Sequence, residues 1–327
     1  MTGTSNRDLS LDFMKGVLIY LVVFGHVIAK YADPGWAYTV IHTFHMPLFF
    51  FISGYLMVPS MKRSFGAFAG KKWIRILRPA LLWSLLFLLL KLPSHLDFAT
   101  KIIKSLMDIW FLYVLFYLYM VAWPMTKSKN RYLWYGLAVV AGYLIYPFLL
   151  KVPSRHFGYI VEEFRIIREL PVFLMGILYW EYKDKMKDWH KYLAVAVAAI
   201  LYFLCFFHTL VWKGQPVQYL LSHENYLMRA LAYQTGTIVA FFLLTIIYNL
   251  LKDGPVAKGI AFVGQNTLGI YAINGLFIFT VPAIIGIDYR FGLPLWLYAA
   301  VLTAVLLGIV WVMKQIPFVR RYFLGES

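Results

Sequence analysis

Two ionisable side chains, Lys15 and His26, lie inside the first long apolar stretch of the sequence. At about 100° per residue, their separation leaves them only about 20° apart around a helix, so they share one face, roughly 16 Å apart along the axis. Ionisable groups inside a membrane helix are costly, and each is a functional hypothesis by default. His26 is a candidate general base, because an imidazole takes and returns a proton near neutral pH. Taken alone, Lys15 could snorkel to the membrane interface and His26 could be a packed, hydrogen-bonded core residue.

Two further histidines, His42 and His45, open the second apolar stretch, which continues through Ser53 and Tyr55. If this stretch is a helix that starts outside the membrane, both histidines lie at the depth of His26. Three histidines at one depth could bind a metal, since imidazole suits zinc. No carboxylate or thiolate obviously completes such a site, so we expect none.

Arg75 and Arg78 stand three residues apart before a third apolar stretch and share one helical face. A pair of guanidinium groups suits phosphate, whose oxygens accept bidentate hydrogen bonds. The alternative is that both arginines only anchor a helix end in the cytoplasm.

The composition shows which elements position these residues. Of the 327 residues, 61% are hydrophobic and 14% are charged, against about 45–50% and about 25% in soluble domains. The net charge of +16 suits cytoplasmic loops and anionic lipid, and we expect no nucleic-acid partner. The single cysteine, Cys205, excludes an internal disulfide and a multi-cysteine zinc site.

The sequence therefore predicts an all-α, polytopic membrane protein that forms a single domain over residues 1–327. A bilayer span needs about 20 apolar residues. Ten segments fit: 11–30, 38–58, 73–92, 105–123, 132–150, 168–180, 191–212, 226–251, 259–285 and 293–314. The sixth is the weakest, because Glu162, Glu163, Arg165 and Arg168 precede or begin it.

Lysine and arginine are concentrated in the loops that follow the even-numbered spans and in the C-terminal tail. These residues are Lys62, Arg63, Lys71, Lys72, Lys127, Lys129, Arg131, Lys183, Lys185, Lys187, Lys191, Lys314, Arg320 and Arg321. The bias predicts that both termini lie in the cytoplasm.

Several motifs together resemble the integral-membrane acyltransferases of acyltransferase family 3, over about residues 7–285. The first runs from Leu11-Asp12-Phe13-Met14-Lys15-Gly16 to Gly25-His26, and the second comprises Phe44-His45-Met46-Pro47-Leu48-Phe49-Phe50 and Ser53-Gly54-Tyr55. Arg75-x-x-Arg78-Pro79 follows, and Gly264-Gln265-Asn266-Thr267-Leu268-Gly269-Ile270-Tyr271 is a weaker match. The first third looks most similar to the fucose O-acetylase-like branch of bacterial sugar acetyltransferases.

The resemblance implies a protein of the bacterial inner membrane, surrounded by membrane lipid, that takes an acyl group from a cytoplasmic donor, typically acetyl-CoA or another acyl-CoA. The acceptor would be a hydroxyl of a saccharide, a glycolipid or another cell-envelope glycan. Lys15, Arg75 and Arg78 would then bind the phosphates of the donor. The sequence departs from the family at Asn274, where a histidine often stands.

On this interpretation His26 deprotonates the acceptor hydroxyl. His45 could orient His26, donate to the thioester oxygen or share its proton. Asp12 could orient or neutralise Lys15, and His42, Ser53 and Tyr55 are further polar candidates. The rivals are a transporter or flippase of a lipid-linked sugar, although no inverted repeat is apparent, and a sensory or scaffolding membrane protein.

Overall fold

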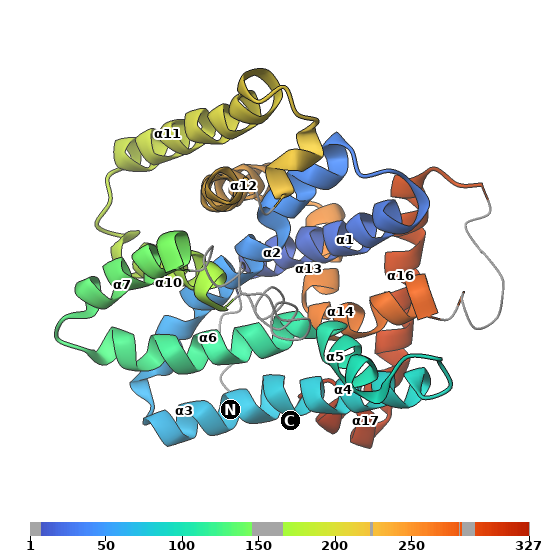
Figure 1. Cartoon of the computed structure of the whole chain (residues 1–327). Helices are drawn as coiled ribbons and strands as arrows, with labels where there is room; N and C mark the ends of the chain where they lie inside the picture. The colour runs from blue at the N-terminus through green and yellow to red at the C-terminus, as the bar shows by residue number, and fades with distance from the viewer. Residues whose placement is uncertain (1–7, 146–165, 223–224, 281, 283–291, 327) are drawn as a thin grey trace. The chain divides into compact units, whose positions relative to one another are not determined.

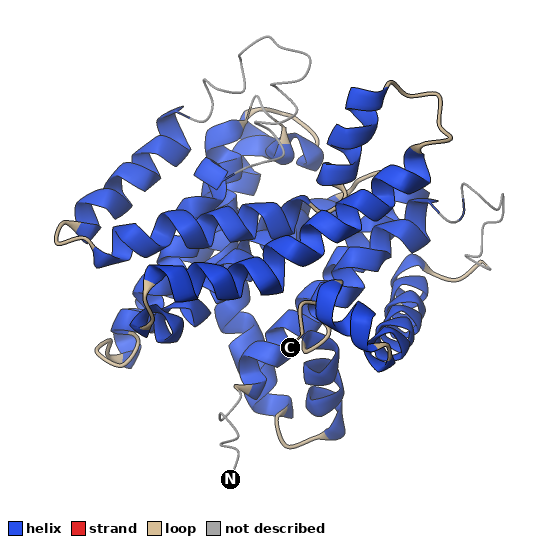
Figure 2. Cartoon of the chain, turned by 90° about the horizontal axis from the view of Figure 1, so that it is seen from below, coloured by secondary structure: helices blue, strands red, loops and turns tan. Residues whose placement is uncertain are grey.

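The computed structural model describes residues 8–145, 166–222, 225–280, 282 and 292–326. The described residues form helices, turns and loops, with no strand among them (Figures 1 and 2). They fall into two compact units, which are described separately. Unit 1 comprises residues 1–49 and 188–311, and unit 2 comprises residues 50–187 and 312–327.

Within the described ranges, six helical segments are long and apolar enough to cross a membrane, or up to eight if each of two bent pairs forms one span. The six are Leu9–Tyr31, Trp36–Lys62, Phe65–Lys91, Asp188–Trp212, Tyr226–Leu251 and Leu295–Gln315. The chain is therefore an all-α polytopic membrane protein. The first part of the expected span 132–150 is helical, as α7 (Arg131–Val140) and η3 (Ala141–Ile145). The rest of this span lies outside the described residues, and so do Glu162, Glu163 and Arg165.

Unit 1 is built around α1 (Leu9–Tyr31), whose N-terminus is capped by the carboxylate of Asp8. The other helices that place most of their residues in this unit are α11 (Asp188–Phe207), η4 (His208–Trp212), η5 (Val217–Leu221), α12 (Tyr226–Leu251), α13 (Pro255–Gly264), α14 (Thr267–Gly275), η6 (Leu276–Thr280) and α16 (Leu295–Gln315). The N-terminal part of α2 (Trp36–Met57) also belongs to it.

Helices α1 and α13 touch through two glycines (Figure 1). A Cβ atom on Gly16 would overlap the carbonyl oxygen of Ile260, and one on Gly264 would overlap the carbonyl oxygen of Asp12. Small residues of this type let helix backbones approach closely. Because Ile260 meets Gly16 and the later Gly264 meets the earlier Asp12, α13 passes α1 in the opposite direction.

The expected span 259–285 is not one straight helix, because the chain bends by 65° between α13 and α14–η6. After the bend, Asn274 contacts His26 and the carbonyl of Ile278 accepts from Lys30, so α14–η6 also lies against α1. The side-chain amide of Asn266 donates to the carbonyl of Phe262 at 2.7 Å. This bond serves a backbone oxygen at the break, where helical partners are lost.

Unit 2 contains the C-terminal part of α2 and a longer span than the expected 73–92. Here α3 (Phe65–Lys72), a π-helical turn η2 (Trp73–Leu77) and α4 (Arg78–Lys91) follow one another. The expected span 105–123 is a bent pair, α5 (Phe98–Met107) and α6 (Trp110–Lys127), with an angle of 68°. The remaining elements of the unit are η1 (Val58–Lys62), α7, η3, α10 (Ile166–Tyr182) and α17 (Pro317–Tyr322).

Unit 2 has its own glycine contact, between α2 and α10. A Cβ atom on Gly54 would overlap the carbonyl oxygen of Phe173, and one on Gly176 would overlap that of Phe51. Ser53-Gly54 is a pair of small residues, a type that permits close helix approach, and the structure shows such an approach at Gly54.

Candidate functional site

The ring of His26 forms a hydrogen bond with a side chain from another helix. Its Nδ1 atom lies 2.6 Å from Oδ1 of Asn274 on α14, and Asn274 is buried, with 1% of its surface exposed. The ring of Phe279 contacts the His26 ring edge-on, with centroids 5.8 Å apart. The histidine inside the first span therefore has a defined orientation, set by the paired segment α14–η6.

His42 and His45 lie in the N-terminal half of α2, in unit 1. His42 contacts α1 at Gly25, the residue before His26. The ring centroids of His42 and His45 are 4.8 Å apart, and a Cβ atom on Gly25 would lie 3.0 Å from Cε1 of His42. The absence of a side chain at Gly25 thus makes room for His42 directly beside the residue that precedes His26.

Each of these two histidines donates from Nδ1 to a backbone carbonyl one turn earlier. The partners are Tyr38 for His42, at 2.8 Å, and Ile41 for His45, at 2.7 Å. A carbonyl oxygen only accepts hydrogen bonds, so Nδ1 carries the proton in both rings. When such a ring is neutral, its lone pair is at Nε2, the nitrogen that can act as a base.

Lys15 is paired with Asp12, and its Nζ lies 2.6 Å from the carboxylate. The side chain of Asp12 is 3% exposed and that of Lys15 is 21% exposed, so the lysine keeps access to its surroundings while the acid is buried. This is the pairing that their three-residue spacing predicted. Lys30, which sequence reasoning missed, donates to the carbonyl of Ile278 at 2.6 Å.

The two arginines lie in unit 2 and have different surroundings. Arg75 is exposed on the π-helical turn η2. Arg78 begins α4, is partly buried, and donates from Nη2 to the carbonyl of Arg321. Its guanidinium also lies 4.7 Å from the ring centroid of Tyr322. Of the expected phosphate-binding residues, the structure brings together Arg75 and Arg78, while Lys15 belongs to unit 1.

A C-terminal segment, residues 322–326, packs against η2 and α4, which together form the arginine-bearing helix. The indole nitrogen of Trp83 donates to the carbonyl of Phe323 at 3.0 Å, and their rings meet edge-on with centroids 5.3 Å apart. Gly325 has a φ of 66° and lies against the backbone of Arg75 so closely that a Cβ atom would collide with it. A glycine near the C-terminus is the one sign of this contact in the sequence, and sequence reasoning missed it.

Ser53 and Tyr55 have structural partners in unit 2. The hydroxyl of Tyr119 donates to the carbonyl of Ser53 at 3.2 Å, and Nζ of Lys183 donates to the hydroxyl of Tyr55 at 2.7 Å. This hydrogen bond raises the pKa of the Lys183 amine, which lies in the turn after α10. These contacts give both residues a role in packing.

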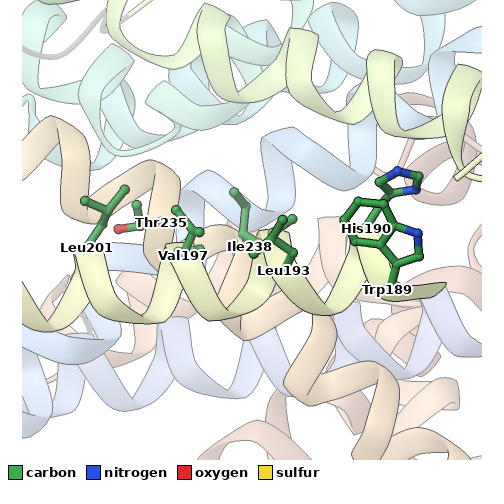
Figure 3. Close-up of a pocket in the computed structure, with 9 residues that line it drawn as sticks. Trp189, His190, Leu193, Val197, Leu201, Thr235 and Ile238 are labelled. Atoms are coloured by element: carbon green, nitrogen blue, oxygen red, sulfur yellow. The ribbon is translucent and has the colours of Figure 1, made fainter. Parts of the chain in front are cut away.

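A groove of about 420 Å³ lies between α11 and α12 in unit 1 (Figure 3). Trp189 and His190 stand at one end and Leu201 at the other, and the lining between them is largely aliphatic. None of the site residues named above lines it. In the parts of the chain that are described, no group of three or more histidine, cysteine, aspartate or glutamate side chains could hold a metal ion.

The structure is that of an all-α membrane protein in which His26 on α1 has a fixed orientation. The residue that orients it, Asn274, lies on α14, after the bend that follows α13. The family model described as "Acyltransferase domain" matches residues 8–314. The chain belongs to this family, acyltransferase family 3, and is a membrane-bound enzyme that transfers acyl groups. Family membership therefore favours the enzyme over the transporter, flippase and scaffold alternatives.

Two curated relatives are similar over most of the chain. Nodulation protein NolL of Mesorhizobium japonicum is 28% identical over 301 residues, which cover 84% of this chain and 77% of the relative. Nodulation protein NolL of Sinorhizobium fredii is 26% identical over 364 residues, which cover 99% and 93% of the two chains. The similarity thus includes both units.

Proposed function

We propose that the protein is an O-acyltransferase that moves an acyl group, most simply acetyl, from a cytoplasmic acyl-CoA to a hydroxyl of a saccharide or cell-envelope glycan. The observation that carries the proposal is the orientation of His26 inside the apolar helix α1. An acyltransferase needs a base that can receive the hydroxyl proton, and an imidazole held in one orientation meets that need.

The proposed reaction is direct transfer. The acceptor oxygen attacks the thioester carbonyl while its proton passes to Nε2 of His26. The tetrahedral intermediate collapses, the C–S bond breaks, and the proton passes from His26 to the departing CoA thiolate. The products are an ester and CoA thiol. The ring of His45 lies beside that of His42, with centroids 4.8 Å apart, and in its neutral form has its lone pair at Nε2.

Lys15, Arg75 and Arg78 would compensate the phosphate charges of the donor on the cytoplasmic side. Charge-assisted hydrogen bonds to phosphate are among the stronger ones, and Arg75 is exposed. The ion pair with Asp12 would hold Lys15 in position before the donor arrives.

The proposed orientation puts both termini in the cytoplasm of a bacterial inner membrane. The support is the bias of lysine and arginine toward the loops on one side. In a Cys205→Ser background, thiol reagents that do not cross the membrane should leave Ser5→Cys and Ser327→Cys unlabelled in intact cells. Labelling of either position from outside would contradict this orientation.

The transfer itself is tested by mass spectrometry of envelope glycans from cells with and without the protein. The proposal predicts that an acetyl or larger acyl increment on a glycan disappears without the protein. It also predicts that the increment returns with the wild-type chain and stays absent with His26→Ala. If the glycans were identical in all these cells, and purified protein transferred no acyl group from acyl-CoA to saccharides, the proposal would be wrong.

A further inference from the structure

The amide of Asn274 has an unambiguous orientation. Its Nδ2 donates to the carbonyl of Tyr271, three residues earlier on α14. A carbonyl cannot donate, so the nitrogen side of the amide must face Tyr271 and the oxygen side must face His26. Oδ1 of Asn274 is likewise only an acceptor, so Nδ1 of His26 must carry the proton.

We propose that Asn274 is a positioning residue that holds His26 in the Nδ1–H tautomer and thereby presents Nε2 as the base. The inference rests on the proposed function, in which His26 accepts the hydroxyl proton. It assigns a role to Asn274 that acts through His26, and Asn274 itself touches no reacting atom.

The segment that bears Asn274 is anchored on both sides of it. One turn later, the carbonyl of Ile278 accepts from Lys30 at 2.6 Å. Before it, the contact between Gly264 and the backbone of Asp12 fixes where α13 ends and the bend begins. Both contacts are with α1, the helix of His26, so the distance between the amide and the ring is fixed at two points.

Asn274 differs from the partners of the other two histidines. His42 and His45 donate to carbonyls of their own helix, and such partners are present whatever the side chains are. The Nδ1 partner of His26 is instead a side chain that lies 248 positions away in the sequence. A single substitution can therefore remove its partner.

The first test reads the tautomer directly. In protein labelled with ¹⁵N-histidine, the imidazole ¹⁵N chemical shifts show which nitrogen carries the proton, and comparison with His26→Ala identifies the His26 signals. We expect Nδ1–H in the wild type and a mixture of tautomers in Asn274→Ala. A wild-type His26 with its proton on Nε2 would overturn the proposal, as would an Asn274→Ala protein that retains Nδ1–H.

The second test reads the kinetics, with Asn266→Ala as a matched control. Asn266 is also buried on this broken span, and its amide also donates to a backbone carbonyl, but it contacts no histidine in the part of the chain described. Loss of the group that orients a metal-binding histidine costs roughly 10- to 100-fold in metal affinity or activity, and a loss of the same order is expected for His26. We expect Asn274→Ala to lose that much in kcat with little change in the donor KM, and Asn266→Ala to keep kcat within about 3-fold.

Asn274→Asp, which keeps an oxygen facing Nδ1, should preserve the tautomer in a folded protein. Equal reductions of kcat in Asn274→Ala and Asn266→Ala, with an unchanged tautomer, would show that Asn274 is merely structural. If His26→Ala remained active while the tautomer depended on Asn274, the proposed function would fail and the role of Asn274 in orienting the ring would stand.

Discussion

His26 in unit 1 and Arg78 in unit 2 have different kinds of hydrogen-bond partner. In unit 1, the partner of His26 is a side chain, the amide of Asn274. In unit 2, Arg78 donates to a backbone carbonyl of Arg321, and the neighbouring Trp83 donates to that of Phe323. A side-chain partner can be removed by one substitution, whereas a backbone partner requires that its whole segment be displaced. The histidine is therefore sensitive to sequence, and the arginine pair is sensitive to the position of the chain's last residues.

The largest effect is expected in unit 1, for His26→Ala. Removing a general base costs about 10²- to 10⁴-fold in rate. We therefore expect turnover to fall by about 10²-fold or more, while membrane insertion and folding are retained. Acyl transfer from acyl-CoA by purified protein measures it. Near-normal turnover of a folded His26→Ala protein would show that another residue is the base. The contrast between His26 and the arginine pair would then have no bearing on catalysis.

A different kinetic signature is expected in unit 2, for the double variant Arg75→Ala, Arg78→Ala. A hydrogen bond to a charged group contributes about 1.5–3 kcal/mol. The donor KM should therefore rise roughly 10- to 100-fold for each hydrogen bond to phosphate that the variant cannot form, with a smaller change in kcat. Arg75→Lys should also raise KM, because lysine keeps the charge but does not have the planar fork. Calorimetry with CoA checks the result. Unchanged affinity would show that both arginines only anchor the helix.

A smaller effect is expected for Trp83→Phe, which keeps an aromatic ring but removes the donor to Phe323. One neutral hydrogen bond contributes about 1 kcal/mol. If the C-terminal segment positions the arginines, the donor KM should rise about 2- to 5-fold with kcat unchanged. The matched control is Trp73→Phe, because Trp73 is exposed on the adjacent turn. If the donor KM changed equally in the two variants, the C-terminal segment would have no role in donor binding.

The smallest effect on catalysis is expected for Gly54→Ala, which tests packing alone. The added methyl group would collide with the carbonyl of Phe173, and overpacking typically costs about 1–3 kcal/mol. The Tm should fall, while the donor KM of the folded protein stays near that of the wild type. Gly70→Ala is the control, since a Cβ atom there meets nothing within 4 Å. A Tm as high for Gly54→Ala as for Gly70→Ala would contradict the close approach of α2 and α10.

Much of the site could be predicted from periodicity within single helices. The shared face of Lys15 and His26 and the pairing of Lys15 with Asp12 need only the helical repeat. The role of Asn274 could not be predicted in this way. Periodicity says which residues share a face but not which distant helix lies against it.

The bend near Gly264 was also missed. No proline marks it, and apolar residues continue on both sides, so the sequence looks like one span. Gly264 lies in close contact with the backbone of Asp12. This contact joins two helices that are far apart in the sequence, so the sequence alone does not reveal it. The same holds for Gly325, whose positive φ and contact with Arg75 depend on a turn that local composition does not specify.

The packing of the C-terminal segment has a practical consequence for work with this enzyme. Lys314 pairs with Glu326 at 2.6 Å, and Gly325 fits tightly against η2. Only two residues therefore separate a fluorescent reporter or affinity tag joined directly after Ser327 from Gly325, which packs against η2. Such a fusion is expected to bind donor more weakly than one with a long glycine–serine spacer. Expression screens that rank variants by a fused C-terminal reporter would then report on the tag as well as on the variant.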